Sequence, residues 1–501
     1  MCAGISWRRA GLWAGAALLA ASLLALQIAR FHGLRYDDAY ITYRYGQNLA
    51  TGHGLVFNPG ERIMGSTSPL HALLSALIYA LVGKEALPSV MAALGCAGWM
   101  AQAIAVFFLL RAALGALPAF LAALAVAAGA AGSSEWVTLE TNLVAAFALW
   151  AVVAAVASRW TAAALLLGLA GLTRPDAYLL ALPLGLLALP ALRAGRLRWW
   201  PPALAFTAVT VPWLVFAAVY FGTVVPQSAA TKAGRAAPGT YLLHLLTEPA
   251  KALIPGRDGP AWIVLAWLLI VAGAAFLVAR RPRLWVLPAW GLLHFAAYSL
   301  LRPFTAHRWH LYPLVLVAVL GALSAVAAVA HREPRRLTRP LAVVALAAAV
   351  VLAAAHTVWW AQTHLETRRF GSRDRVYRQT VEYLRARSRP GDDLVAAVEV
   401  GTLGYYGGFR MFDLGGLITR PPGDLAAWPH PDWFVLDTWY LYIVPKEKPV
   451  AAFRNGPFTA YIFAVSPRSR AAVAAAAPGA GAALQPTRPP FTGGEPPFVG
   501  R

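Results

Sequence analysis

Apolar runs of about 20 residues recur along the first 360 positions of the chain, separated by short polar or basic stretches. A helix needs about 20 apolar residues to cross a hydrocarbon core about 30 Å thick, so this pattern predicts a polytopic membrane protein. The candidate segments lie at 11–29, 69–82, 90–110, 118–131, 143–157, 161–172, 177–192, 203–221, 261–278, 284–301, 311–330 and 341–359.

Basic residues gather in the stretches between the apolar segments. The strongest clusters lie at 193–198, 280–283 and 332–339. They fall on one side of the membrane if the late segments all cross, and the positive-inside rule makes that side the cytoplasm. Arg8 and Arg9 precede the first segment as in a signal peptide, but no small-residue cleavage site follows, so we expect a retained first helix.

The number of crossings follows from these clusters. If all the segments crossed, the clusters would lie outside, so one segment is expected not to span. The candidates are 69–82 and 161–172, which are short for a membrane-crossing helix. We therefore expect about 11 crossings in a bacterial inner (plasma) membrane, with a cytoplasmic N-terminus and an extracytoplasmic, periplasmic C-terminal domain.

The pattern changes after Trp360. Residues 372–389 have the charged, amphipathic period of a helix. Residues 394–398, 433–436 and 461–465 have the pattern of short strands, with Gly and Pro turns between them. This alternation predicts a small α/β domain.

The domain organisation follows from these patterns. We expect a mainly α transmembrane domain at 1–360, with the extracytoplasmic stretch 30–68 as its first loop, and the small α/β domain at 365–469. The Ala/Gly/Pro-rich tail at 470–501 is expected to be disordered.

Composition and charge support a membrane protein. Hydrophobic residues make up 59% of the chain and charged residues only 13%, whereas a soluble globular protein has about 25% charged residues. The net charge of +21 does not indicate nucleic-acid binding, because the arginines lie in short clusters between apolar runs. Cys2 and Cys96 offer neither a disulfide framework nor a metal-binding pattern.

The first loop carries the most distinctive chemistry. Asp37 and Asp38 lie in it, with Tyr40 and Arg44 close behind. Neighbouring carboxylates repel each other, so at least one is expected to have a raised pKa or a cationic partner. Such a group can act as a general base toward a hydroxyl or bind a divalent cation; the alternative is a solvated turn or a helix cap. The tyrosines and Arg44 favour a ligand pocket.

The stretch YDDAYITYRYGQNLATGHGLVFNPGERIMGSTSPLHALL, at 36–74, resembles the first extracytoplasmic loop of GT-C glycosyltransferases. In particular it resembles the bacterial terminal β-1,2-arabinofuranosyltransferases, which use a polyprenyl-phosphate sugar donor. In that family an Asp-Asp pair in this loop is needed for catalysis, and the resemblance places the pair at Asp37 and Asp38.

Weaker matches extend the resemblance over most of the chain. They lie at 139–141, 172–176, 220–232, 308–313, 399–407, 413–417 and 431–432. Gln227 stands where the family commonly has Asn, and no match fixes which sugar is moved.

Three ionisable residues interrupt apolar sequence on or near the outer side. Glu140 opens an apolar segment, where a carboxylate can simply stabilise a helix N-terminus. Arg174 and Asp176 are candidates for substrate binding because charges at membrane depth are costly. Their alternative role is a mutual ion pair that braces a short loop.

A group of potentially cationic residues lies in one outside loop, where the positive-inside rule disfavours them. They are Arg302, His307, Arg308 and His310. A donor phosphate at the membrane surface would explain them, since Arg matches phosphate oxygens bidentately; anionic lipid headgroups are the alternative. Lys232 and Arg235 form a second cationic pair in the stretch 222–260, which we expect to be another outside loop.

Other polar and aromatic residues are expected to have structural roles. Aromatic residues near the predicted interfaces are expected to be belt anchors: Tyr36, Tyr40, Tyr43, Trp136, Trp309 and Tyr312. Glu399, Asp413 and Asp437 lie near predicted strand ends, where they either bind an acceptor glycan or solvate a loop, and we favour the loop.

The resemblance implies a membrane glycosyltransferase of the inverting type. Its donor would be a polyprenyl-phosphate sugar, with a pentose such as arabinofuranose expected, and its acceptor a hydroxyl of a cell-envelope glycan or glycolipid. A divalent cation is possible, but no ligand set demands one. The alternative function is a transporter or flippase for lipid-linked glycans, which would predict internal repeats; no clear repeat is visible.

Overall fold

The protein is described from a computed structural model, and its residues fall into two units. The described residues are 7–130, 132, 136–234, 236–253, 259–303, 308–332, 338–365, 370–389, 391–419, 429–438, 447–456 and 458–475. One unit comprises Met1–Gly33, Ser89–Thr210 and Gly234–Ala361, and the other comprises Leu34–Pro88, Val211–Ala233 and Gln362–Arg501. The first loop therefore groups with the residues that follow it, up to Pro88, and with the C-terminal region, whereas the helix that precedes it belongs to the other unit.

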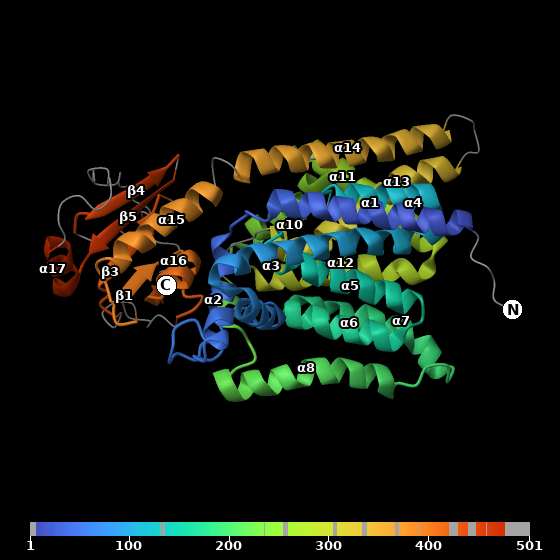
Figure 1. The fold of residues 1–501 in the computed structure, drawn as a ribbon. Coiled ribbons are helices and arrows are strands. Elements are labelled where there is room, and N and C mark those ends of the chain that lie inside the picture. Colours follow the sequence, from blue (N-terminus) through green and yellow to red (C-terminus); the bar gives the residue numbers. More distant parts are fainter. Residues whose placement is uncertain are drawn as a thin grey trace. The chain divides into compact units, whose positions relative to one another are not determined.

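The first unit is helical (Figure 1). Its elements are α1 (Trp7–Phe31), the second half of α3 (Pro69–Leu114), α4 (Ala116–Ala127), α5 (Thr141–Val156), α6 (Trp160–Thr173), η2 (Pro175–Leu180), α7 (Ala181–Arg193), the start of α8 (Trp200–Phe221), α10 (Pro238–Leu253), α11 (Pro260–Arg280), η3 (Pro282–Trp285), α12 (Val286–Leu301), η4 (Arg308–Leu311), α13 (Tyr312–Arg332) and α14 (Thr338–Leu365).

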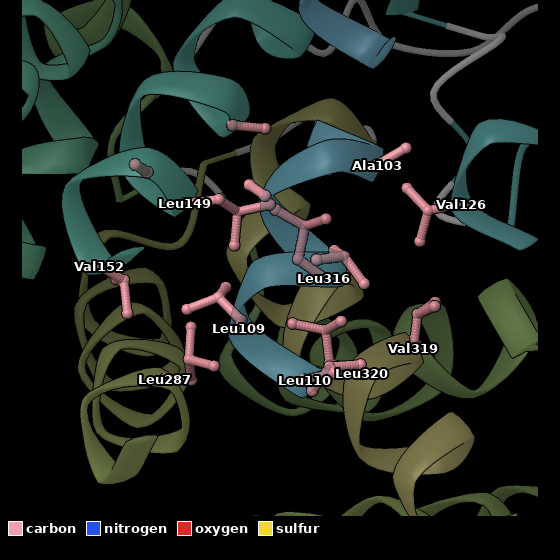
Figure 2. Close-up of a cluster of buried hydrophobic side chains, with 14 of the residues drawn as sticks. Ala103, Leu109, Leu110, Val126, Leu149, Val152, Leu287, Leu316, Val319 and Leu320 are labelled. Atoms are coloured by element: carbon pink, nitrogen blue, oxygen red, sulfur yellow. The ribbon is translucent and has the colours of Figure 1, made fainter. Parts of the chain in front are cut away.

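Apolar side chains from several helices form the core of this unit. Figure 2 shows Leu109 and Leu110 of α3 beside Leu149 of α5 and Leu316 of α13. α11 and α13 approach so closely that a Cβ added to Gly273 would meet the backbone of α13. Small residues permit such close helix contacts in membranes, where apolar surface alone does not drive association.

The predicted apolar segments coincide largely with helices. Seven helices are long and apolar enough to cross a membrane, and four shorter apolar helices accompany them among the described residues. Segments 69–82 and 90–110 both lie in α3, which kinks at Gly83, where φ is 78°. Residues 69–82 group with the second unit. Whether this segment or 161–172 fails to span, and the number of crossings, remain predictions.

Helices also occur where the sequence predicted loops. α2 (Asp37–Ala50) lies inside the predicted loop 30–68. α9 (Gln227–Lys232) and α10 occupy most of the stretch 222–260, which was expected to be an outside loop. α10 escaped prediction because it is amphipathic and contains Pro249.

The second unit contains a five-stranded sheet with the order β2-β1-β3-β5-β4. Its strands are β1 (Leu394–Ala397), β2 (Arg410–Asp413), β3 (Trp433–Asp437), β4 (Ala451–Asn455) and β5 (Phe458–Ala464). β1 pairs in parallel with β2 and β3, whereas β5 pairs antiparallel with β3 and β4. Ala396, Phe412, Leu414, Leu436 and Phe463 form a buried cluster on this sheet.

Three helices accompany the sheet. α15 (Phe370–Arg385) packs against β4, β5 and α16 (Gly401–Gly407), and α16 packs against α2. α17 (Pro467–Ala475) follows β5, so the first residues of the tail predicted to be disordered are helical. The rest of that tail lies outside the described residues.

Candidate active site

Asp37 joins the first loop to the C-terminal domain within the second unit. Asp37 is the first residue of α2 and follows Tyr36, whose backbone is extended. One carboxylate oxygen accepts the backbone N–H of Gly401 and the other that of Thr402, both at 2.8 Å. These amides begin α16, so the carboxylate satisfies two of the N–H groups that a helix start leaves unpaired.

A dense charge network surrounds Asp37. The guanidinium of Arg373, on α15, forms ion pairs with Glu399 at 2.5 Å and with Asp437 at 3.1 Å. The hydroxyl of Tyr377 donates a hydrogen bond of 2.6 Å to the same Asp437 carboxylate. Three carboxylates thus gather near one arginine, with Asp37 bonded to backbone amides rather than to a cationic side chain.

This environment shifts the pKa of Asp37 into the physiological range. Burial raises the pKa of Asp37 from 3.8 to about 7, and the negative charge of Glu399 adds to the rise. The charge of Arg373 and the hydrogen bond from Thr402 lower the pKa, but by less. A carboxylate with a pKa near the working pH is suited to general-base catalysis, and such shifts are typical of functional sites.

A small pocket opens beside this carboxylate. It is lined by Arg35, Asp37, Tyr40, Arg373, Asp374, Tyr377 and Thr402. Its volume of about 10 Å³ is close to the minimum that holds one water molecule. A sugar ring does not fit, so an acceptor could reach this oxygen only after neighbouring side chains move.

Asp38 and Tyr40 differ sharply in exposure. Asp38 is exposed, whereas Tyr40 is almost fully buried. The Tyr40 hydroxyl donates to Asp374 and lies 3.3 Å from the Tyr406 hydroxyl. Tyr40 therefore supports the wall of the pocket from within the protein.

Arg44 also lies inside the protein. Its side chain donates to the carbonyl of Phe57 and to the Gln47 side chain. Burial lowers the pKa of Arg44 to about 10. These contacts assign Arg44 to bracing α2 against the loop that follows it, whereas its predicted role in substrate binding rests on the sequence alone.

Glu140, Arg174 and Asp176 meet in the first unit. The alternative role predicted for Arg174 and Asp176, a mutual ion pair, is therefore present. Arg174 pairs with Glu140 and with Asp176, both at 2.8 Å, and all three side chains are nearly buried. Tyr298 donates a hydrogen bond of 2.8 Å to Asp176. This network ties the start of α5 to η2 and α12.

The predicted phosphate-binding residues have varied surroundings. Arg308 donates to Glu248 of α10 at 2.8 Å, and Lys251 pairs with the same carboxylate. Burial alone would raise the pKa of Glu248, but the hydrogen bond and charge of Arg308 hold it below its ordinary value. Sequence reasoning missed Glu248 because it lies in a stretch interpreted as loop.

The remaining members of that set have contacts of their own. Arg302 ends α12 in a left-handed conformation and donates to the carbonyl of Ala236. The carbonyl of His310 lies 2.8 Å from the His294 ring. Lys232 belongs to the second unit, and His307 and Arg235 lie outside the described residues.

The acidic residues of the C-terminal domain divide into two groups. Asp413 is fully buried and accepts the backbone N–H groups of Gly415, Leu417 and Ile418, so it stabilises a loop from within rather than solvating one. Glu399 and Asp437 instead join Arg373 in the network around Asp37. Arg373 could have been singled out only as a charge on the buried face of an amphipathic helix.

Several aromatic residues predicted to be membrane anchors are buried in the protein. Tyr36, Tyr40, Tyr43, Trp136 and Tyr312 are each less than one-tenth exposed. They contribute to packing because neighbouring elements cover them. Within the described ranges, no group of three or more His, Cys, Asp or Glu side chains is arranged to hold a metal ion.

Comparison with known proteins gives structural likenesses only. No protein-family model matches the sequence, and no curated protein matches it. ArnT from Cupriavidus metallidurans matches in its apo state and bound to undecaprenyl phosphate, each with a TM-score of 0.57 and 15% identity over 90% of this chain and 98% of that chain. An oligosaccharyltransferase from Archaeoglobus fulgidus, in complex with Zn and sulfate, matches with a TM-score of 0.50 and 12% identity over 83% of this chain and 68% of that chain. These likenesses identify the fold of the chain as GT-C-like, the fold that its first loop predicts.

Proposed function

We propose that this protein is a membrane glycosyltransferase that uses a polyprenyl-phosphate sugar donor. The observation that carries the proposal is the carboxylate of Asp37, which lies in the first loop of a GT-C-like fold and has a pKa raised to about 7. ArnT, whose fold the chain shares, binds undecaprenyl phosphate in one of its structures. The donor sugar is proposed to be a pentose such as arabinofuranose, because the first loop resembles the arabinofuranosyltransferases.

In the proposed reaction, the ionised carboxylate of Asp37 takes the proton of an acceptor hydroxyl. The hydroxyl oxygen forms a bond to the anomeric carbon of the donor as the bond from that carbon to the phosphate oxygen breaks. The polyprenyl phosphate leaves with the electron pair, and a single displacement inverts the anomeric configuration. The acceptor is a hydroxyl of a cell-envelope glycan or glycolipid.

The environment of Asp37 supports this role. At neutral pH a base with a pKa of about 7 is half ionised, so it can both take the acceptor proton and release it afterwards. The two backbone amides fix the carboxylate in one orientation. Arg373 and Glu399 are positioning residues in this scheme, because they set the charge around the base.

Binding of the donor phosphate is assigned to cationic residues of the outer loops. Arg302, Arg308, His310 and Lys232 are proposed to contact it, and Glu248 would orient Arg308 through their bond. Cationic hydrogen-bonding groups of this kind stabilise the negative charge that develops on the leaving phosphate oxygen. Glu140, Arg174 and Asp176 are proposed to contribute to substrate binding through their ion-pair network.

The test is a transfer assay with the purified protein in detergent. A panel of polyprenyl-phosphate donors, each with a different labelled sugar, is offered with envelope glycan acceptors. The proposal predicts transfer to glycan from at least one donor, with a pentose donor the most active. Detergent leaves no sealed membrane, so transfer seen there cannot be transport. If no donor supports transfer and the protein instead moves a lipid-linked glycan across the membrane of sealed vesicles, the transporter is favoured.

A further inference from the structure

An open pocket lies at one end of the first unit. It has a volume of about 640 Å³. The link from α5 to α6, the link from α7 to α8, and η3 contribute its walls. Figure 1 shows both links at the end of this unit where α1 begins. Two basic clusters that are far apart in the sequence, at 193–198 and 280–283, therefore meet here.

The pocket is strongly cationic. Four exposed arginines line it, Arg159, Arg196, Arg198 and Arg283. None of the described residues that line it is acidic. Guanidinium groups repel one another unless an anion lies between them, and their planar donors match phosphate oxygens.

Two further features of the pocket favour an anion. Arg283 donates to the carbonyl of Val156 and to the hydroxyl of Ser158, at 2.8 and 3.0 Å, so its guanidinium is held in place. α6 begins in the pocket at Trp160 without a side-chain cap. The positive end of the helix dipole, together with N–H groups of its first turn, therefore adds to the charge of the arginines.

The surroundings indicate a lipid rather than a soluble anion. Trp199 and Trp200 are 70% and 52% exposed beside the pocket, and exposed tryptophan is typical of the membrane–water interface. Leu165 of α6 and Leu204 of α8 are also exposed, which gives acyl chains an apolar surface next to the cationic site. Basic pockets between transmembrane helices on the cytoplasmic side bind anionic lipid headgroups.

We propose that this pocket binds the headgroup phosphate of an anionic phospholipid such as phosphatidylglycerol. The arginines contact the phosphate, and the acyl chains lie along the outer faces of α6 and α8. By the positive-inside rule, the lipid belongs to the cytoplasmic leaflet. This site does not depend on the proposed transfer reaction, and its test needs no activity.

The test measures lipid binding to the full chain in detergent micelles by native mass spectrometry. The probes are phosphatidylglycerol, phosphatidylcholine and inorganic phosphate. We expect phosphatidylglycerol to bind in preference to phosphatidylcholine, and the Arg196→Gln/Arg198→Gln double variant to bind it at least about tenfold more weakly, because two charge-assisted contacts are lost. Arg193→Gln, from the same basic cluster but outside the pocket, should bind as the wild type does.

Two results would overturn the proposal. Equal binding of phosphatidylglycerol to the double variant and to Arg193→Gln would place the lipid elsewhere. Saturable displacement of phosphatidylglycerol by inorganic phosphate at the same concentration as the lipid would assign the site to a soluble anion. If the double variant does not fold, Arg159→Gln gives the same comparison from another wall of the pocket, with weaker binding expected.

Discussion

The charge network around Asp37 makes a quantitative prediction about pH. A base must be ionised to act, and the pKa of Asp37 is raised to about 7 by burial and by the charge of Glu399. The ionised fraction is then about one-tenth at pH 6, half at pH 7 and nine-tenths at pH 8. We therefore expect kcat/KM for sugar transfer to rise about tenfold between pH 6 and pH 8.

Glu399→Gln tests whether this network sets the pKa. The substitution removes a negative charge that raises the pKa of Asp37, and it removes one carboxylate partner of Arg373, whose charge lowers that pKa. Both effects act in the same direction. A charged neighbour within about 6 Å shifts a pKa by about 1–3 units, so the midpoint of the profile should move down by about one pH unit.

The assay is transfer of labelled sugar measured from pH 5 to pH 9 at low donor concentration. Glu382→Gln is the matched control, because Glu382 is an exposed residue of α15; its profile should coincide with that of the wild type. A wild-type rate that is flat from pH 5.5 upward would refute the raised pKa. A shift of the Glu399→Gln midpoint to higher pH would refute the role given to Glu399.

Three other predictions concern the helical unit and the topology. Arg174→Gln leaves two buried carboxylates without their partner and should lower the free energy of unfolding by about 3–5 kcal/mol; thermal unfolding in detergent should show no such loss for the exposed Arg193→Gln. Arg308→Ala should reduce both turnover and donor affinity, whereas Arg332→Ala should change neither; equal kinetic constants for both variants at matched protein levels would remove Arg308 from the site. A reporter fused after Trp360 should be active only if it is exported, and a cytoplasmic signal would overturn the topology.

The sequence predicted the helices of the first unit well because apolar runs of membrane length are a strong local signal. The boundaries of α11 and α14 lie close to the predicted segments. α2 was missed because its residues are mostly buried polar and aromatic side chains that follow neither a membrane nor a simple amphipathic pattern. β2 and β4 were missed because each is only four or five residues long, although Gly407-Gly408 precedes β2 and Asn455-Gly456 marks the turn from β4 to β5.

The candidate site was predicted only in part, since most of its chemistry depends on contacts distant in sequence. The Asp37–Asp38 pair stood out locally, and the pKa of Asp37 is raised, but by burial and by the charge of Glu399 rather than by the neighbouring Asp38 that prompted the expectation. No local pattern indicates that Asp37 caps a helix more than 360 residues away. The partnership of Arg373 with Glu399 likewise requires the fold of the α/β domain.

The most direct test of the account is the effect of Asp37→Asn on sugar transfer by the purified protein. Asparagine keeps the shape of the side chain and an oxygen that accepts one of the two backbone N–H groups, but it cannot take a proton from the acceptor. We expect turnover of Asp37→Asn to fall by about 10²–10⁴-fold, whereas Glu382→Gln retains wild-type turnover. Both variants should be folded and should unfold in a single thermal transition. A well-folded Asp37→Asn variant that transfers sugar at a rate near that of the wild type would contradict the assignment of Asp37 as the base.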